Sequence, residues 1–340
     1  MTALCEWHWG ASPTSDGTVP ASRRAGRAGF AGRAAAGCNP VLWSGMDGVI
    51  VVDKPAGWTS HDAVNRMRRL AGTRKIGHLG TLDPQATGVL PLVIGRATRL
   101  AQFYVRNDKV YDAVVHFGYS TDSYDKDGAP TSPVTEPRID HEDLERALAG
   151  FRGAIDQVPP PVSAKKIAGT PAYKLARKHK PVDLAPVKVE IYSLILLEHS
   201  GNSNEARIKV HCSGGTYLRS IAHDLGGILG CGAFLKDLRR IASGGFTLDQ
   251  ARTLDQLASL AQENRLVEAL IPGAKLLPEF PAEMVDGHTA ARIRQGRDFR
   301  VSPFRIRGAP KHVKAITQEG ELVAIGEAVL PNLYHPILVL

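Results

Sequence analysis

Apolar runs of strand length, separated by helical segments at irregular intervals, constrain the fold of this 340-residue chain more than any other feature. Residues 47–55 and 88–95 each contain an apolar run that predicts a buried strand, and residues 111–117 alternate as half-exposed strands do. The segments 187–198 and 205–213 predict two more strands. Because helices and strands do not alternate in regular βαβ units, the pattern predicts an α+β fold with a mixed, largely antiparallel sheet.

Four helices are predicted in this part of the chain, one of them a short helix through Leu100 and Phe103 that follows residues 88–95. Thr59 and Asp62 form a capping box ahead of a helix that carries Ala63, Val64 and Met67 on one face. Asp140 stands at the N-cap position of a second amphipathic segment. The fourth helix covers the sequence TYLRSIAHDLGGILG.

Composition divides the chain into three parts. Residues 1–45 are rich in Gly, Ala, Ser, Thr and Pro and have no apolar period, so we expect a disordered N-terminal extension, or a start codon placed too far upstream. Residues 46–280 carry the strands and helices above and form the large domain. Residues 281–340 combine one short helical segment with several short strands, which predicts a small β-rich accessory module.

The overall charge favours a polyanionic partner. Lys and Arg number 42 against 34 Asp and Glu, which gives a net charge of +8. The four cysteines (Cys5, Cys38, Cys212 and Cys231) are widely spread and indicate a reducing compartment. No apolar run approaches the roughly 18 residues that a membrane span needs. We therefore expect a cytoplasmic protein without a membrane segment.

The stretch KIGHLGTLDPQATGVLPLVIG is the most unusual part of the chain. Asp83 is its single acid, and between Ala63 and Asn107 no other acid occurs. Pro84 disfavours a helix at Asp83, and the flanking glycines allow a tight loop. Positive charge around a carboxylate favours its anionic form, so the pattern predicts a nucleophile or base on a cationic surface. The neighbouring cations are Arg66, Arg68, Arg69, Arg74, Lys75, Arg96, Arg99 and Arg106.

Other chemistry is not indicated by the sequence. Residues 123–128 superficially resemble a calcium loop, but its twelfth position is Val134, where a bidentate Glu is needed. His211, Cys212, His223 and Cys231 lack zinc spacing. Neither GxxxxGK[ST] nor GxGxxG occurs, so no nucleotide cofactor is expected.

Taken as a whole, GHLGTLDPQATGVLPL closely resembles the signature of the bacterial tRNA pseudouridine-55 synthases of the TruB type. The resemblance covers nearly all of residues 46–340. It includes VDKPAGWTSHDAV, RATRLAQFYVRNDKVYDAVVHFGYSTDSYDKDG, QVPPPVSAKKIAGTPAYKLAR and CSGGTYLRSIAHDLGGILGCGAFLKDLRR. It implies a pseudouridine synthase fold with a PUA-like RNA-binding domain at 281–340. It also implies a monomer that isomerises uridine 55 in the T stem-loop of tRNA, without a metal, an organic cofactor or an obligate protein partner.

The resemblance also implies roles for individual residues. Asp83 matches the catalytic nucleophile, Arg219 the arginine that pairs with it, and Tyr111 the active-site tyrosine that stacks on the target base. His78 matches a histidine that fills the space of the flipped nucleotide, and Tyr217 is expected to support the pocket. We expect further positive charges to face the phosphates of the RNA. These are Lys54, Lys165, Lys166, Lys174, Arg177, Lys178 and Lys180.

Two alternatives and one mechanistic choice stay open on sequence alone. The chain could bind or fold RNA without catalysis, or it could be the archaeal and eukaryotic relative that depends on a guide RNA. The residues 158–180, which match the bacterial type, favour a stand-alone enzyme. Attack of Asp83 on the anomeric carbon of the ribose, as in a retaining glycosidase, and attack on the uracil ring are both consistent with the motif.

Overall fold

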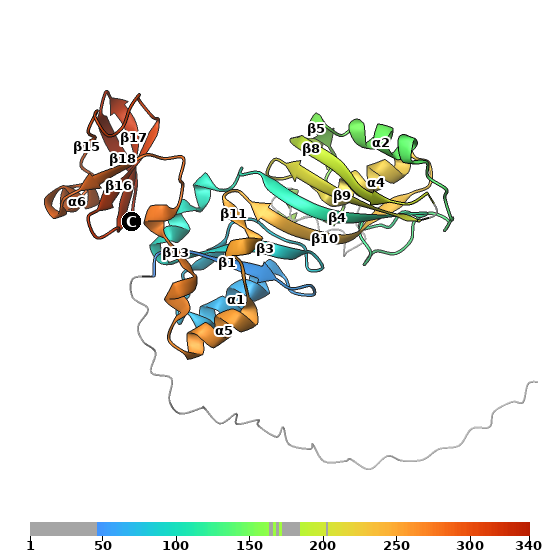
Figure 1. Ribbon diagram of the computed structural model, residues 1–340, viewed down its shortest axis with the longest axis horizontal. Coiled ribbons are helices and arrows are strands. Elements are labelled where there is room, and N and C mark those ends of the chain that lie inside the picture. Colours follow the sequence, from blue (N-terminus) through green and yellow to red (C-terminus); the bar gives the residue numbers. More distant parts are fainter. Residues whose placement is uncertain (1–45, 163–165, 168–169, 172–183, 202) are drawn as a thin grey trace, which may run out of the picture. The chain divides into compact units, whose positions relative to one another are not determined.

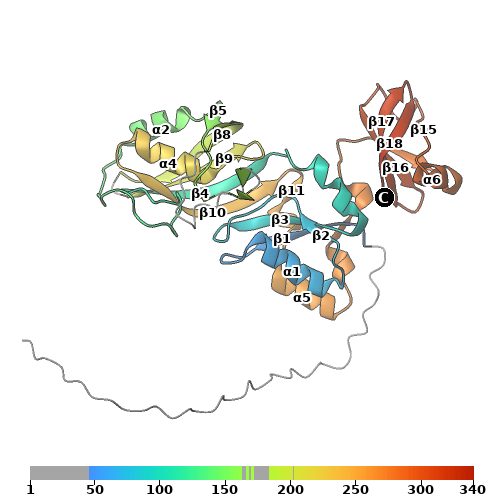
Figure 2. The same ribbon diagram turned by 180° about the vertical axis from the view of Figure 1, so that it is seen from behind.

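The computed structural model describes residues 46–162, 166–167, 170–171, 184–201 and 203–340. Most of the chain's strands belong to one sheet in which nearly all neighbours are antiparallel; β12 beside β1 and β10 beside β3 are the parallel pairs (Figures 1 and 2). The prediction of a mixed, largely antiparallel sheet is therefore confirmed. The strands run in the spatial order β12 (Arg252–Thr253), β1 (Gly48–Lys54), β3 (Thr87–Ile94), β10 (Ala233–Ser243), β4 (Lys109–Phe117), β9 (Glu205–Cys212), β8 (Val187–His199) and β5 (Gly153–Gln157).

Shorter strands and the helices complete this part of the chain. Strand β2 (Ile76–His78) pairs with β3, β11 (Phe246–Thr247) with β10, and β13 (Leu270–Pro272) with β1; β6 (Lys166–Ile167) and β7 (Thr170–Pro171) pair with each other. The α-helices are α1 (Ser60–Leu70), α2 (His141–Ala149), α4 (Leu218–Ile228) and α5 (Leu254–Gln262). The 3-10 helices are η1 (Gly95–Phe103), η2 (Leu248–Gln250), η3 (Leu266–Ala269) and η4 (Gly273–Lys275).

The helices cover one face of the sheet and leave the other face to a second core. Helices α1 and α5 lie beside β1, α2 lies beside β8, and α4 lies against β10 and β4 (Figures 1 and 2). Strand β1 contributes to both cores, because Ile50 and Val52 pack under the helices whereas Val49 and Val51 pack on the opposite side. This two-sided burial explains why β1 is an unbroken apolar run rather than an alternating one.

The helix starts predicted from the sequence have three different outcomes. Thr59 and Asp62 form the predicted capping box, with the Thr59 hydroxyl accepting from Asp62 N at 3.1 Å. Asp140 occupies the predicted N-cap of α2, but its side chain makes no capping hydrogen bond. Tyr217 is the N-cap of α4 and not part of its helical face, which corrects the predicted start of that helix.

Strand β10 is the longest of the described strands that the sequence does not reveal. It lies between β3 and β4 in the centre of the sheet, yet it contains Lys236, Asp237, Arg239 and Arg240. Two β-bulges, at Leu235/Asp237 and Arg240/Ala242, break its alternation. Because bulges shift which side chains face the core, neither an alternating nor an apolar pattern marks this strand.

A second sheet forms the C-terminal β-rich domain. Its strands are, in spatial order, β14 (Ala282–Val285), β16 (His312–Thr317), β17 (Leu322–Leu330), β18 (Leu333–Val339) and β15 (Phe299–Arg300), and helix α6 (Gly287–Arg294) packs on it. Residues such as Ile293, Phe299 and Val313 give this domain a small core of its own. The division of the chain at residues 45 and 280 stays a prediction, because residues 1–45 lie outside the described part and the two sheets belong to one compact unit.

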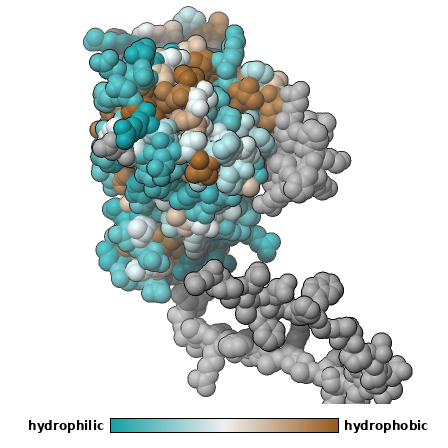
Figure 3. Space-filling view, turned by 90° about the vertical axis from the view of Figure 1, so that its right-hand side faces the viewer, coloured by the Kyte–Doolittle hydropathy of each residue, from teal (hydrophilic) through white to brown (hydrophobic). Residues whose placement is uncertain are grey.

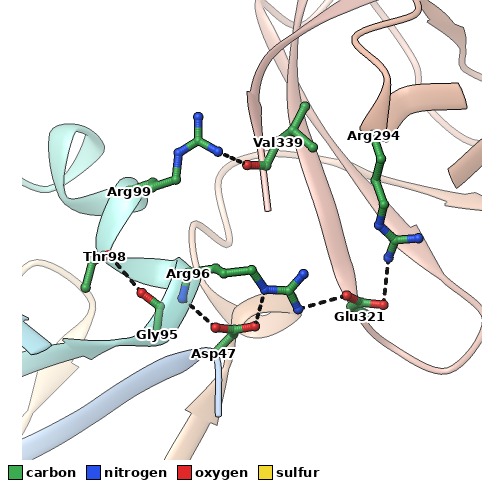
Figure 4. Close-up of polar contacts among 8 residues, drawn as sticks. All are labelled: Asp47, Gly95, Arg96, Thr98, Arg99, Arg294, Glu321 and Val339. Carbon is green, nitrogen blue, oxygen red and sulfur yellow. Dashed lines mark hydrogen bonds and ion pairs between the residues drawn. The ribbon is translucent and has the colours of Figure 1, made fainter. Parts of the chain in front are cut away.

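Apolar and charged contacts join the second sheet to the first. Ile316, Leu322 and Leu338 pack in the same core cluster as Val49 and Leu100. Around this cluster Asp47 binds Arg96 at 2.6 Å, and Glu321 accepts from both Arg96 at 3.0 Å and Arg294 at 2.9 Å, while Arg99 donates to the Val339 carbonyl (Figure 4). These ion pairs are partly exposed, so each contributes less than about 1 kcal/mol, and the buried apolar contacts dominate the joint.

The surface of the large sheet's far end is mainly hydrophilic. Figure 3 shows the hydrophobic residues of this face as several separate areas among hydrophilic ones. On β8, Tyr192, Ile195 and Leu197 are exposed. Single exposed apolar residues are normal for a globular protein. In the described part of the chain, no helix is both long enough and apolar enough to cross a bilayer.

Leu100 tests the importance of the shared core. Its side chain is fully buried in η1 between the two sheets, so Leu100→Ala should lower the free energy of unfolding by about 2–5 kcal/mol through lost burial and a cavity. The control is Leu330→Ala, which removes a side chain that is 63% exposed and should change stability by less than about 0.5 kcal/mol. Urea denaturation measures both; equal effects would contradict the shared core.

Candidate active site

The loop between β2 and β3 carries Asp83, and polar contacts hold the residues on either side of it. The hydroxyl of Ser60, the first residue of α1, accepts from Leu82 N at 2.9 Å and donates to Leu82 O at 3.1 Å. The ammonium of Lys54, at the end of β1, donates to Pro84 O at 2.9 Å. The backbone before and after Asp83 is therefore fixed to two different elements.

Arg240 holds the other half of the same loop. Its guanidinium has no exposed surface and donates to Val89 O at 2.8 Å, Gly80 O at 3.1 Å and Thr81 O at 3.2 Å. A guanidinium offers five donors in a rigid plane, so one side chain of β10 ties the loop to β3. Gly80 has a φ of +128°, which a residue with a side chain rarely adopts.

Arg219 of α4 binds the Asp83 carboxylate. Its Nε lies 3.0 Å from Asp83 Oδ2, and its Nη1 lies 3.4 Å from Asp125 Oδ2. The remaining guanidinium contacts are donations to Ser123 O at 3.0 Å and Val162 O at 2.9 Å. The Arg219 side chain is only 6% exposed whereas that of Asp83 is 44% exposed. The buried arginine thus orients the carboxylate, and the exposed part of the carboxylate remains accessible to a ligand.

The start of α4 is anchored so that Arg219 points at this loop. The side-chain amide of Gln157, at the end of β5, accepts from Tyr217 N at 2.8 Å and donates to Tyr217 O at 3.0 Å. The Ser220 hydroxyl donates to Val158 O at 2.7 Å. Since both contacts flank Arg219 in sequence, the first turn of α4 has little freedom to move the guanidinium.

A cavity of about 330 Å³ brings the predicted residues together. Its wall includes Asp83, Arg219, Tyr111, His78 and Tyr217. The volume falls at the lower end of the range of small-molecule sites, about 300–1,000 Å³. Elements far apart in sequence thus meet at one hollow, as a functional site requires.

Two titratable side chains of this wall, Tyr111 and His78, are uncharged at neutral pH. Burial raises the pKa of Tyr111, so its phenol keeps its proton. Burial, and then the charge of Arg240, lower the pKa of His78, so its imidazole is neutral. The buried Nδ1 of His78 has no hydrogen-bond partner among the described residues. Tyr111 can therefore donate a hydrogen bond or stack, and His78 can fill space or bind a ligand atom without carrying charge.

The cations that meet Asp83 are not the ones close to it in sequence. Arg96 and Arg99 bind Asp47 and the C-terminal domain instead, and Arg68 donates to the side chain of Asn65 and to the backbone of β2. For these three of the eight neighbouring cations, the expectation of a place around the carboxylate is corrected. The contact comes from Arg219, which is 136 residues further along the chain.

Lys54 also lies elsewhere than we expected. Its ammonium is buried and donates to Pro55 O at 2.8 Å, Trp58 O at 2.6 Å and Pro84 O at 2.9 Å, so it does not face phosphates. Burial lowers its pKa to about 8. The phosphate-facing roles of the other lysines and the arginine stay predictions. Lys165, Lys174, Arg177, Lys178 and Lys180 lie outside the described residues, and for Lys166 only the backbone, in β6, is described.

Comparison with known proteins identifies the family. Residues 68–218 match the model for the N-terminal domain of TruB family pseudouridylate synthases, and residues 219–277 match the model for the C-terminal domain of tRNA pseudouridylate synthase B. The tRNA pseudouridine synthase B of Solibacter usitatus is 64% identical over 295 residues, which cover 87% of this chain and 100% of that protein. The chain belongs to the TruB family of pseudouridylate synthases. It is therefore an isomerase.

More distant members and solved structures agree with this assignment. The tRNA pseudouridine synthase B of Aquifex aeolicus is 39% identical over 282 residues, covering 83% of this chain and 96% of that protein. A chain in the crystal structure of a Cbf5-Nop10-Gar1 complex is 26% identical with a TM-score of 0.63, covering 84% of this chain and 80% of that one. The predicted pseudouridine synthase fold is thus confirmed.

Three side chains of the TruB site were not singled out from the sequence. Asp125, which shares Arg219 with Asp83, lies in a segment that matches a family motif and was also considered as a calcium loop, but no role was assigned to the residue itself. Burial raises its pKa, against the effects of the Ser123 hydroxyl and Arg219. Arg240 and Lys109 line the cavity from β10 and β4. The family motifs STDSYDKDG, FLKDLRR and KVYDA contain all three, and that resemblance is the signal that could have found them.

The structure gives two of the His and Cys residues that lack zinc spacing other surroundings. His211 binds Asp108, and Cys212 is buried with a pKa raised to about 11. Within the described residues, no three His, Cys, Asp or Glu side chains are placed to hold a metal ion. A reaction without a cofactor stays a prediction that rests on the family resemblance.

Lys54→Met tests the loop anchor. The change keeps much of the aliphatic stem but removes the donor of three partly buried hydrogen bonds, so the free energy of unfolding should fall by about 1–3 kcal/mol. Lys311→Met is the matched control, since that side chain is 74% exposed, and should change stability by less than about 0.5 kcal/mol. Denaturant titration of both variants distinguishes a buried anchor from a surface lysine.

His78 makes stability depend on pH in a defined direction. Because its pKa in the folded protein lies below the ordinary value of 6.5, the unfolded chain binds a proton first as the pH falls. Stability is therefore lost below pH about 6.5, and His78→Gln should lose less than the wild type between pH about 7.5 and 5.5. Urea midpoints across this range measure the difference; parallel curves for the two proteins would contradict a neutral, buried His78.

Proposed function

We propose that this chain isomerises uridine 55 in the T-loop of tRNA to pseudouridine, with Asp83 as the nucleophile. The observation that carries the proposal is the carboxylate of Asp83, fixed by Arg219 and open to a cavity that Tyr111 and His78 also line. The names of the relatives from Solibacter usitatus and Aquifex aeolicus support tRNA as the substrate.

The reaction needs only a nucleophile and the movement of one proton. The carboxylate attacks, the bond between N1 and the anomeric carbon breaks, and the uracil rotates. A bond then forms between C5 and the anomeric carbon, C5 loses its proton, N1 gains one, and the carboxylate leaves unchanged. Attack on the anomeric carbon and attack on the uracil ring give the same product and the same balance of atoms.

The other cavity residues fit separate tasks in this scheme. Arg219 keeps Asp83 oriented and compensates its charge through a charge-assisted hydrogen bond. Tyr111, a protonated phenol, offers a ring on which the uracil stacks and a donor for one of its oxygens. His78, which is neutral, fills the place that the extruded nucleotide leaves in the T-loop.

Base flipping follows from the depth of the site. Tyr111 is only 7% exposed, so a uracil that reaches it must leave the stack of its own RNA loop. Extruding a base costs a few kcal/mol, and least for a base that is already outside a duplex. A loop nucleotide is therefore a better substrate than a nucleotide in a helix.

The C-terminal domain supports RNA binding through its charge. The segment from Gly287 to Lys311 contains seven Lys or Arg and the single acid Asp298, which binds His335. Arg292, Arg297 and Arg300 border one hollow, and no ion pair is formed by these three side chains with the described residues. We propose that this PUA-like domain contacts the phosphates of the tRNA. We further propose that the enzyme acts as a monomer on bare tRNA, which activity of the purified chain would test.

Asp83→Asn separates catalysis from RNA binding. The amide preserves the shape of the side chain but is no nucleophile, so the rate of pseudouridine formation should fall at least about a thousand-fold. The dissociation constant for tRNA should change by less than about three-fold, because shape recognition persists. Mass-sensitive mapping of pseudouridine and filter binding measure the two quantities.

The control for this variant is Asp140→Asn. Asp140 stands at the N-cap of α2 and makes no side-chain capping bond, and Asn is as good an N-cap, so both rate and affinity should stay at wild-type values. Product at a position other than 55 would overturn the substrate assignment. Equal loss of rate and affinity in Asp83→Asn would favour an RNA-binding protein without catalysis.

A further inference from the structure

Tyr124 has a backbone conformation that large residues avoid. Its φ is +64°, in the left-handed region, where Asn is tolerated but a bulky side chain meets its own carbonyl. Such conformations persist only where the surroundings hold them. Tyr124 lies between Ser123 and Asp125, two residues that contact Arg219. The residues immediately before and after Tyr124 therefore both belong to the site.

The turn directs two oxygens at one nitrogen of Arg219. Ser123 O lies 3.0 Å from Nη1, and Asp125 Oδ2 lies 3.4 Å from the same atom. Between them, Tyr124 O accepts from Leu235 N of β10 at 3.0 Å. The carbonyl of Tyr124 thus points to the sheet while its neighbours point to the guanidinium, which the left-handed backbone of Tyr124 allows.

The Tyr124 ring is stacked on helix α4. Its centroid lies 3.7 Å from that of His223, and the two planes differ by 8°. His223 follows Arg219 by four residues, so both side chains leave α4 on the same face, one turn apart. The helix that supplies the guanidinium therefore also supplies the surface that holds the turn.

Both rings are neutral at pH 7 and lie outside the cavity. Burial lowers the pKa of His223 and raises the pKa of Tyr124. The buried Nδ1 of His223 has no hydrogen-bond partner among the described residues, so stacking is the contact that the structure gives to this ring. Neither ring lines the cavity. A change at either ring would therefore act on the cavity through the turn and Arg219.

We infer that Tyr124 and His223 are positioning residues that set the direction of Arg219, and through it that of the Asp83 carboxylate. The stacked rings fix the distance between the turn and α4. Ser123 O and Asp125 therefore both bind Nη1 of Arg219, and Nε remains available to bind Asp83. This inference rests on the proposed role of Asp83.

The experiment replaces each ring and separates rate from binding. In Tyr124→Ala and His223→Ala, the single-turnover rate of pseudouridine formation in a T stem-loop RNA should fall about ten-fold or more, because small misplacements of a catalytic group are costly. The dissociation constant for the RNA should stay within about two-fold of the wild type. Since both rings belong to one contact, the double variant should be no slower than the slower single variant.

Conservative variants test whether the ring contact itself matters. Tyr124→Phe and His223→Phe keep two stacked rings and should restore the wild-type rate. Tyr124→Gly accepts the left-handed backbone without strain but removes the ring, so it should be as slow as Tyr124→Ala. Tyr192→Ala is the matched control, because Tyr192 forms another tyrosine–histidine contact, with His211, on the outer face of β8, and its loss should leave the rate unchanged.

A second measurement does not depend on the reaction. The Nε–H resonance of Arg219, assigned by its loss in Arg219→Lys, should exchange with solvent faster in Tyr124→Ala and His223→Ala than in the wild type. Wild-type rates and exchange in both alanine variants would overturn the inference. So would a fully active Tyr124→Gly, or a loss of rate that only follows a loss of folded protein or RNA affinity. Activity in Asp83→Asn would refute the proposed function instead, while the exchange measurement would still test the stack.

Discussion

The burial of the Arg219 guanidinium is the constraint on which the site depends. A buried charge is costly unless opposite charge and hydrogen bonds compensate it, and this side chain is 6% exposed. Asp83 and Asp125 supply the opposite charge, and two backbone carbonyls accept further hydrogen bonds from the guanidinium. Because these partners come from separate segments, the β2–β3 loop, the turn after β4 and the start of α4 must converge. The geometry of Asp83 is thus a consequence of satisfying one arginine.

Buried cations serve the same purpose in the rest of the loop. Lys54 and Arg240 have no exposed surface. Lys54 donates to backbone carbonyls of segments that lack regular structure, and Arg240 donates to two such carbonyls in the loop and to Val89 O in β3. Carbonyls in such segments have no ladder partner, so an unpaired one in the interior would be destabilising. A long cationic side chain supplies several donors at once. The loop around Asp83 is therefore rigid without being a helix or a strand, which suits a nucleophile that must keep its direction.

The C-terminal domain is part of the same structural unit as the site. Leu79, next to His78 on the cavity wall, belongs to the apolar cluster that also contains Leu100 and Leu338. The ion pairs around Arg96 and Glu321 lie at the edge of this cluster (Figure 4). The C-terminal domain therefore buries core residues beside the cavity, in addition to the RNA contact that we propose for it. The contribution to stability is carried mainly by the buried apolar area, since partly exposed ion pairs contribute little.

The sequence by itself determined five of the long strands and the identity of the nucleophile candidate. Apolar runs and alternation marked β1, β3, β4, β8 and β9 because burial on one or both faces leaves a periodic trace. The capping box at Thr59 was visible because its atoms are three residues apart. Asp83, Tyr111, Arg219, His78 and Tyr217 were found by resemblance to TruB motifs, and the structure brings all five to one cavity.

Only the tertiary structure decided which charges meet. Arg68, Arg96 and Arg99, which are close to Asp83 in the sequence, bind other groups, while Arg219 reaches it from a distant helix. Lys54 is a buried anchor and Asp125 contacts Arg219 in the site, although Lys and Asp are residue types that usually lie on the surface. Periodicity records whether a side chain is buried against apolar neighbours, whereas an ion pair leaves no periodic trace. Its partners are chosen by how loops and helices come together in space, and that is fixed only when the whole sheet has formed.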